Sequence, residues 1–125
     1  MRTLLTIAQF TLLLLAGFQV GLAQSDDPRA QLKSDLGPLH VAVEELRTGE
    51  HSHQLVADVE IFAKGVEWCL RHDEFYPKKR EGVPSTWIKY CQTALKTGMA
   101  RAAELQAGSH SWTSQTGSTI RGYIS

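Results

Sequence analysis

The sequence lacks the features that mark most enzymes and nucleic-acid binders. It contains no G-x-S-x-G nucleophile elbow and no phosphate-cradling glycine loop or cofactor motif, so we assign no catalytic residue and no cofactor. Its 13 basic and 13 acidic residues give a formal net charge of zero. Binders of nucleic acid or anionic membranes carry a basic excess, so the composition disfavours both kinds of partner.

Long apolar runs are also scarce, and the main one lies at the N-terminus. Arg2 precedes an apolar stretch over residues 4–18, and small residues follow at Gly21 and Ala23. This order is typical of a secretory signal peptide. It predicts cleavage between Ala23 and Gln24, which makes the mature protein secreted or periplasmic.

A membrane anchor is the alternative for this stretch. Gln9 and Gln19 interrupt the run, which is shorter than the roughly 20 apolar residues that a membrane span needs. We therefore expect residues 1–23 to be removed and no membrane segment to remain. The remaining chain of about 100 residues suits one small domain, which we place at residues 24–117.

Two short helices are expected after the signal peptide. Asp27 followed by Pro28 is a helix-start signature, because Asp favours the N-cap and Pro the first helical position. The Gly37–Pro38 pair predicts the end of this first helix. A second short helix is predicted over residues 39–47, where apolar residues recur at helical spacing.

Two long helices are predicted over residues 53–72 and 85–107, so the chain is assigned to the mainly α class. Each carries apolar residues that alternate in steps of three and four, which is a helix seam. The turn-rich connector 73–84 lets the two helices return as an antiparallel hairpin. The two seams consist of Leu55, Val59, Phe62, Val66 and Cys69, and of Ile88, Cys91, Leu95, Gly98, Ala102 and Leu105.

Gly98 falls in the middle of the second long helix, where glycine costs about 1 kcal/mol relative to alanine. We expect a neighbouring backbone or a bulky side chain to lie close to it.

The sequence has only two cysteines, Cys69 and Cys91, one on each seam. In an exported chain an even number of cysteines favours a disulfide, and a bridge here would contribute about 3 kcal/mol in the chain-entropy model. The alternative is a pair of buried thiols that pack as small apolar residues. We predict the disulfide.

The final stretch "STIRGYIS", residues 118–125, has the composition of a β-strand. The predicted helices offer no sheet to pair with it, so we expect the beginning of a strand that belongs to a further domain. The aromatic content also exceeds what a helical pair can bury. The residues concerned are Trp68, Phe75, Tyr76, Trp87 and Trp112.

Two histidine-containing motifs could suggest chemistry. "HSH" at residues 51–53 has a spacing that some metal sites use, but no third ligand has a recognisable position. "GSHSW" at residues 108–112 places serine beside histidine, yet triad members meet in space and not in sequence. We interpret the first motif as a helix-capping turn and the second as a loop.

Three stretches of the chain carry a resemblance to a known family. They are "LVADVEIFAKGVEWCLRHDEFY" at 55–76, "LKTGMARAAELQAGSHSWTSQTG" at 95–117 and "RGYIS" at 121–125. Together they resemble the helical N-terminal region of secreted planctomycete-type α/β-hydrolase proteins, related to the prolyl oligopeptidase and esterase group. In those proteins the R-G-Y-x-S strand continues into a D-G-S-x-Q-P-Y element and the catalytic domain.

The resemblance implies a non-catalytic helical segment of a secreted serine-hydrolase or peptidase-like protein. Its partner would be a downstream or separate α/β-hydrolase domain. No family catalytic residue has a counterpart here, so the chain by itself would be inactive, and the expectation is a fragment whose downstream DNA encodes the rest. The alternatives are a self-sufficient small secreted helical module that binds a partner and, more remotely, a histidine-based metal carrier.

Overall fold

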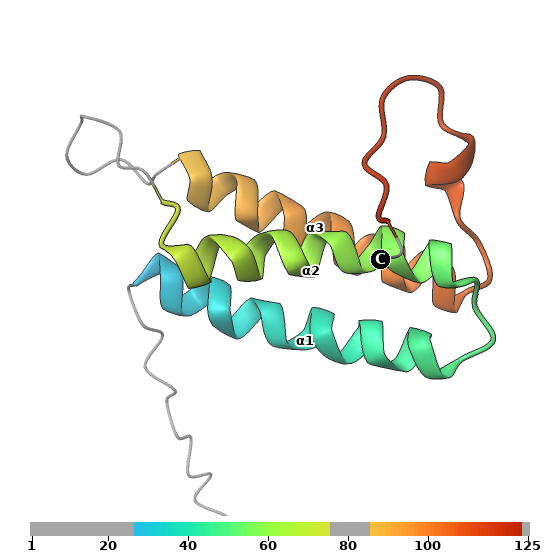
Figure 1. The fold of residues 1–125 in the computed structure, drawn as a ribbon, viewed down its shortest axis with the longest axis horizontal. Helices are drawn as coiled ribbons and strands as arrows, with labels where there is room; N and C mark the ends of the chain where they lie inside the picture. Colours follow the sequence, from blue (N-terminus) through green and yellow to red (C-terminus); the bar gives the residue numbers. More distant parts are fainter. Residues whose placement is uncertain (1–26, 76–85, 124–125) are drawn as a thin grey trace, which may run out of the picture.

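The computed structural model describes residues 27–75 and 86–123, and within them the protein is mainly helical. The elements are α1 (Pro28–Thr48), α2 (His53–His72), α3 (Thr86–Gln106) and the short 3₁₀ helix η1 (Ser111–Ser114). The three α-helices lie side by side, and the chain runs along α1, back along α2 and forward again along α3 (Figure 1). Each helix contacts both of the others. The prediction of a mainly α fold is therefore confirmed.

The helix α1 corrects the prediction of two short N-terminal helices, because it continues through Gly37 and Pro38 to Thr48. An interior proline costs about 3 kcal/mol, since it removes one hydrogen bond and crowds the preceding turn. Buried apolar residues continue on one face across this point and offset that cost, at about 1.5–3 kcal/mol for each large side chain. These residues are Leu32, Leu36, Leu39, Ala42, Val43 and Leu46.

The start of α1 agrees with the sequence signature. The side chain of Asp27 accepts a hydrogen bond from the backbone N–H of Arg29 at 3.0 Å, and Pro28 occupies the first helical position. The helix therefore begins where Asp27 and Pro28 predict. It does not end at Gly37–Pro38, because tertiary packing outweighs the local preference of these two residues.

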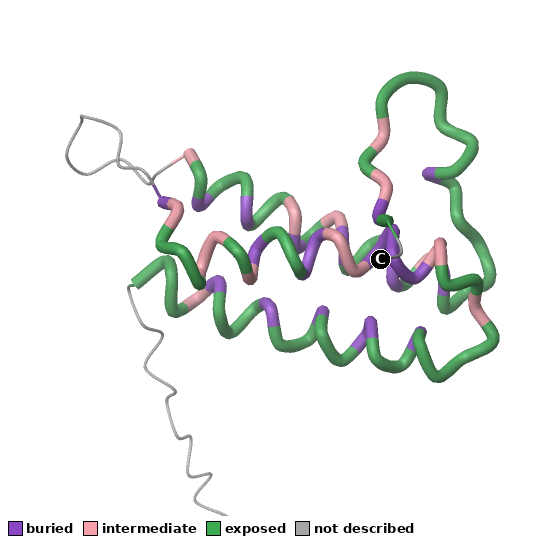
Figure 2. Tube along the Cα trace, viewed as in Figure 1, coloured by how far each residue is buried: buried purple, intermediate pink, exposed green. Residues whose placement is uncertain are grey.

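The two long predicted helices are present as α2 and α3. The bounds of α2 match the prediction, and α3 runs from Thr86 to Gln106, one residue short of the predicted end at Ala107. Every seam residue of α3 is buried, from Ile88 to Leu105. Figure 2 shows the buried positions as a stripe along the inner side of each helix. Since α1 is as long as its two neighbours, the fold is a three-helix bundle and not a hairpin with short companions.

Gly98 marks the closest approach of the three helices. A Cβ atom at this position would lie 2.8 Å from Cδ2 of Leu39 on α1 and 3.0 Å from Cβ of Phe62 on α2. The expectation of a bulky neighbour is confirmed. Glycine is tolerated in mid-helix because its missing side chain leaves room for these two residues.

The predicted terminal strand is wrong for residues 118–123, which contain no strand or other regular element. After η1 the chain makes a long excursion away from the bundle and returns to lie against α2 (Figure 1). The prediction assumed that only a sheet could satisfy the backbone groups of this segment. Side chains of α2 and α3 bind several of these groups instead.

Several predictions fall outside the described residues. They include the signal peptide at 1–23 with its cleavage point between Ala23 and Gln24, most of the connector, and Tyr76. Within the described ranges, no helix combines the length and the hydropathy that crossing a bilayer requires.

Candidate functional site

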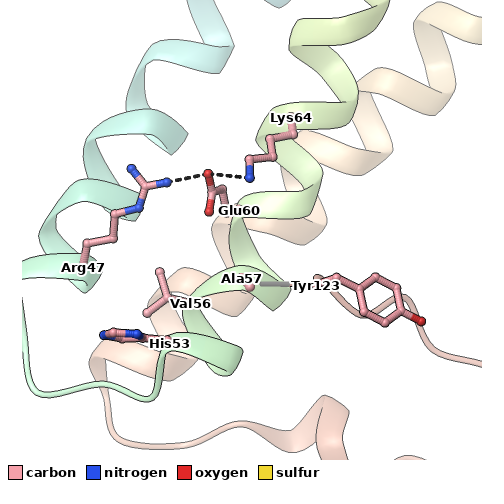
Figure 3. A pocket seen from close by; sticks show the side chains of 7 residues that line it. All are labelled: Arg47, His53, Val56, Ala57, Glu60, Lys64 and Tyr123. Carbon is pink, nitrogen blue, oxygen red and sulfur yellow. Dashed lines mark hydrogen bonds and ion pairs between the residues drawn. The ribbon is translucent and has the colours of Figure 1, made fainter. Parts of the chain in front are cut away.

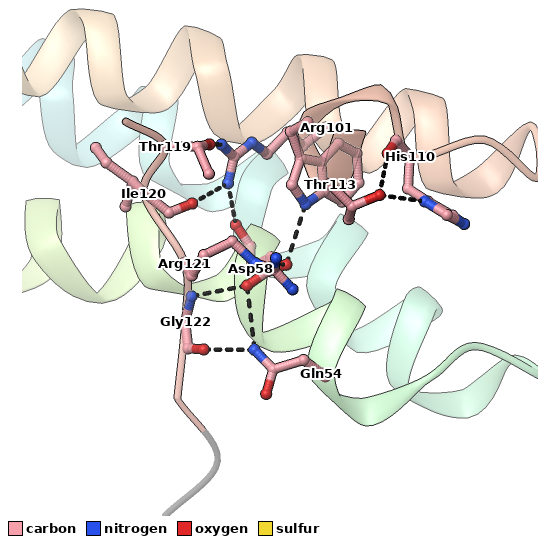
Figure 4. Close-up of polar contacts among 10 residues, drawn as sticks. Gln54, Asp58, Arg101, His110, Thr113, Thr119, Ile120, Arg121 and Gly122 are labelled. Carbon is pink, nitrogen blue, oxygen red and sulfur yellow. Dashed lines mark hydrogen bonds and ion pairs between the residues drawn. The ribbon is translucent and has the colours of Figure 1, made fainter. Parts of the chain in front are cut away.

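A buried carboxylate, Asp58 of α2, lies where the returning segment meets the bundle (Figure 4). It is 0% exposed. Its Oδ2 accepts a hydrogen bond from the indole N–H of Trp112 at 3.0 Å, and its Oδ1 accepts from the backbone N–H of Gly122 at 2.8 Å and from the amide of Gln54 at 3.2 Å. Nε of Arg121 lies 2.7 Å from Oδ2, as an ion pair without hydrogen-bond alignment. The buried charge is thus fully surrounded by partners.

Arg101 of α3 holds the same segment through its guanidinium group and is only 7% exposed. Its Nη1 donates to the backbone oxygen of Asp58 at 3.0 Å and to that of Ile120 at 2.7 Å. Its Nη2 donates to the hydroxyl of Thr119 at 3.1 Å. One side chain therefore links α3, α2 and the returning segment.

Two aromatic rings enclose the guanidinium of Arg101. Its central carbon lies 4.8 Å from the ring centre of Phe62 and 5.1 Å from that of Trp112. Burial lowers the pKa of Arg101, yet an arginine stays protonated in proteins. The positive charge is therefore retained and is stabilised by the faces of the two rings.

Gly122 fits its position because it has no side chain. A Cβ atom there would lie 2.0 Å from the backbone oxygen of Ala57. The backbone oxygen of Gly122 accepts a hydrogen bond from the side-chain amide of Gln54. Both polar groups of this residue are thus bound by α2, and any other residue would push the segment away from the helix.

The hydrogen bonds around Asp58 keep it ionised. Burial raises the pKa of Asp58, but hydrogen bonds from Trp112, Gly122 and Gln54 and the charge of Arg121 together hold that pKa below its ordinary value. The carboxylate cannot act as a general acid near neutral pH. Asp58 therefore acts as a permanently charged carboxylate that accepts hydrogen bonds.

We name the group of Gln54, Asp58, Arg101, Trp112 and the segment Thr119–Gly122 the Asp58 cluster. Our sequence reasoning did not single out Asp58 or Arg101. A signal was present, because Asp58 lies three residues after one seam position and four before another, and Arg101 is placed in the same way on its helix. A lone acid and a lone base, each on the apolar side of its helix, indicate a buried pair.

The "GSHSW" motif has a structural role: it leads into η1 and holds Trp112 in place. It does not form a catalytic group. The backbone N–H and the hydroxyl of Ser111 both donate to Oε2 of Glu104, at 2.9 and 2.8 Å. These two bonds lower the pKa of Glu104. Because Ser111 is bound to a carboxylate and not to the neighbouring His110, the motif holds no serine–histidine pair.

A groove of about 380 Å³ runs beside the cluster along α1 and α2 (Figure 3). Glu60 lies within it and forms ion pairs with Arg47 and with Lys64. Burial raises the pKa of Glu60, but Lys64 and Arg47 bring it below its ordinary value. Because Arg47 also forms an ion pair with Glu44, the two cations are matched by two carboxylates, and the groove lacks the unneutralised charge of an anion site. Its lining residues are Arg47, His53, Val56, Ala57, Glu60, Lys64 and Tyr123.

The two cysteines lie on the inner sides of α2 and α3, both as thiols in this structure. Burial raises the pKa of Cys91 to about 12, and the adjacent Cys69 contributes to the rise. A thiol with so high a pKa is a poor nucleophile at neutral pH. The disulfide between Cys69 and Cys91 stays a prediction, and intact mass after alkylation with and without reductant tests it.

The aromatic residues singled out from the sequence are partly buried in the structure and partly exposed. Phe75 and Trp112 are buried, whereas Trp68 and Trp87 are exposed. The predicted surplus of aromatic surface is therefore smaller than expected, because Trp112 packs against Asp58 and Arg101 and the start of α1 covers Phe75. Among the described residues, no group of three His, Cys, Asp or Glu side chains is placed to hold a metal ion.

Comparison of the chain with protein-family models, curated proteins and solved structures gave no match.

Proposed function

We propose that this protein is a non-catalytic helical module that braces a hydrolase domain of the serine esterase or peptidase type. In this proposal the bundle acts through the Asp58 cluster, which fixes the course of the segment Thr119–Gly122. The observation that carries the proposal is the convergence of three distant stretches of sequence on that one cluster.

These three stretches are the ones that carry the resemblance to secreted α/β-hydrolase proteins. Asp58 belongs to "DVEIF", Trp112 to the stretch after the second long helix, and Arg121 and Gly122 to "RGYIS". Residues that touch one another in a folded unit are constrained together, so similarity at all three places is what a shared three-dimensional unit would produce. In this proposal the three stretches form one three-dimensional unit and not three separate motifs.

The physical effect of the module would be to restrict the chain that leads to the hydrolase domain. Arg101 and the buried carboxylate of Asp58 hold four successive residues of the segment, which leaves it few alternative directions. Restricting a connecting segment in advance reduces the entropy lost when domains dock. Ile120 and Tyr123, exposed by 58% and 86%, would add apolar contact area.

The proposal includes export of the protein. The mature chain would begin at Gln24 after removal of residues 1–23 and would act outside the cytoplasm, where a bridge between Cys69 and Cys91 can persist. The antiparallel pair of α2 and α3 would then be linked covalently as well as through its apolar seam.

The test is to translate the DNA downstream of the Ser125 codon in all three forward frames. We expect a D-G-S-x-Q-P-Y-like element, then a G-x-S-x-G elbow, and then an Asp and a His. If the domain is found, the test protein is this chain expressed in one polypeptide with that domain. There Asp58→Asn should lower the thermal stability of the hydrolase domain. The substitution Val41→Ala, at an exposed position of α1, should leave that stability unchanged. Unrelated downstream sequence would contradict the proposal.

The second candidate is a self-sufficient secreted module that binds a partner. It is favoured by the apolar core, to which all three helices contribute buried residues. A self-sufficient module of residues 24–125 should unfold cooperatively and stay monomeric, whereas an orphaned segment should aggregate. Neither should hydrolyse an ester such as p-nitrophenyl acetate, because the described residues include no activated nucleophile.

A further inference from the structure

We infer that Gln54, Asp58, Arg101 and Trp112 form a peptide-recognition site for an extended segment of the order Thr-x-Arg-Gly. In this structure the chain's own residues 119–122 occupy the site. The inference does not depend on the proposed function, because it concerns the peptide that the bundle recognises and not the domain to which that peptide leads.

Most contacts to the segment are made to its main chain. Asp58 accepts from the N–H of Gly122, Gln54 donates to the oxygen of Gly122, and Arg101 donates to the oxygen of Ile120. Sites for extended peptides use this division, in which main-chain hydrogen bonds supply affinity and side-chain pockets supply specificity. Asp58 and Arg101 are buried, and their further bonds to Trp112 and to the backbone of α2 fix their orientation before a peptide arrives.

Three positions of the segment are selected by their side chains. Position 122 must be glycine, since a Cβ atom would lie 2.0 Å from the backbone oxygen of Ala57. Position 121 is an arginine whose Nε lies 2.7 Å from the buried carboxylate of Asp58. Position 119 presents a hydroxyl to Arg101 at 3.1 Å. By contrast, the side chains of Ile120 and Tyr123 are largely exposed, so their positions should accept many residues.

The segment reaches the site through a loop with few contacts of its own. Residues 115–118 are exposed and belong to no helix, and Gly117 adopts a φ of +98°, which favours glycine. A short flexible linker gives a tethered ligand an effective concentration in the millimolar range. A free peptide therefore has to compete with the attached segment, and binding is best measured in a chain whose own segment cannot dock.

The experiment uses the full mature chain with Gly122→Ala, which should vacate the site and leave its four recognition residues intact. The probe is a blocked six-residue peptide of residues 118–123, added to both the variant and the wild-type protein. The indole N–H signal of Trp112 in a ¹H–¹⁵N spectrum reports occupancy, because that group bonds to Asp58.

We expect the peptide to return the Trp112 signal of the variant to its wild-type position. The wild-type protein should not respond at micromolar peptide, because its site is filled. A peptide with alanine at position 122 should fail, and one with alanine at position 121 should bind at least tenfold more weakly. No response of the folded variant, or equal binding of the alanine-122 peptide, would overturn the inference.

A second design covers a variant that does not fold. A protease site inserted between Gln115 and Thr116 of the wild-type chain allows the exposed loop to be cut after folding. We expect the released segment to stay bound at high protein concentration and to exchange with isotope-labelled wild-type peptide but not with the alanine-122 peptide. A segment that leaves the bundle and is not replaced by the labelled peptide would contradict the inference.

The same site could take the segment of a second copy of this chain, since exchange of identical elements is a common route to dimers. Size-exclusion chromatography over a range of concentrations separates the two sources. A wild-type monomer at all concentrations assigns the site to the chain's own segment, and a dimer that Gly122→Ala abolishes assigns it to the copy. A dimer that persists in the Gly122→Ala variant while that variant also binds the peptide would contradict both assignments, to the chain's own segment and to that of a second copy.

Discussion

The centre of the bundle and the Asp58 cluster are both buried, but they are held together in different ways. At the centre, Leu39 and Phe62 pack against Gly98 through apolar contact alone. In the cluster, a carboxylate and a guanidinium reach their partners through directed hydrogen bonds. Apolar packing tolerates exchange between side chains of similar volume, whereas a buried polar group is costly as soon as one partner is lost.

The difference separates two roles. The apolar seam is continuous over all three helices and accounts for the bundle itself. The polar cluster determines which segment docks on α2 and in which direction. The bundle should therefore survive loss of the cluster, and the cluster should not survive loss of the bundle.

The largest effect should come from the apolar centre. Leu39→Ala removes a side chain that is fully buried between the helices and should lower the free energy of unfolding by about 2–5 kcal/mol. Urea denaturation followed by circular dichroism measures it. Val41→Ala on the exposed side of the same helix is the matched control and should change stability by less than about 0.5 kcal/mol. Similar losses for the two variants would show that the apolar centre is not where we place it.

A smaller and more local effect is expected from Asp58→Asn. The substitution keeps the shape of the side chain but removes the charge that pairs with Arg121 and accepts from Trp112. Hydrogen bonds to charged groups contribute about 1.5–3 kcal/mol, so the unfolding free energy should fall by about 2 kcal/mol. The helical circular dichroism signal should stay. Loss of the helical signal in Asp58→Asn under native conditions would remove the distinction between the two regions.

The smallest effect should appear on acidification below about pH 4. The pKa of Asp58 is lowered in the folded protein, so its contribution to stability is present above the pKa of the unfolded chain, about 3.9, and is lost as the pH falls below that value. The groups that face it are Arg121, Arg101, Gln54 and Trp112. The backbone N–H signal of Gly122, which donates to Asp58, should move only below about pH 4. Movement between pH 5 and 7 would contradict an ionised, bonded Asp58.

The seam residues were predictable because helical spacing is a local property of sequence. All six seam positions of α3 are buried, and the bounds of α2 agree with those predicted. The stop predicted at Gly37–Pro38 was wrong because the leucines on either side gain more from packing on α2 and α3 than the proline costs. That gain depends on partners far away in the sequence, which local rules do not include.

The cluster was not predictable by the same rules. The bonds that join α2 to the rest of the cluster link residues separated by 43 to 68 positions along the chain, and no helical spacing indicates which residues will meet in this way. Residues 118–123 include strand-favouring types, which led to the prediction of a strand. Composition could not indicate that side chains of the bundle, and not a neighbouring strand, would bind that backbone.

Hydrogen exchange at the backbone N–H of Gly122 tests the central claim most directly. This group donates to the buried carboxylate of Asp58 at 2.8 Å, although the residues before it belong to no helix or strand. We expect its exchange to be slowed at least a hundredfold relative to the N–H of Ser118 in the exposed loop, and the protection to vanish in Asp58→Asn while α2 amides remain protected. Exchange of Gly122 as fast as that of Ser118 in the wild-type protein would contradict the account.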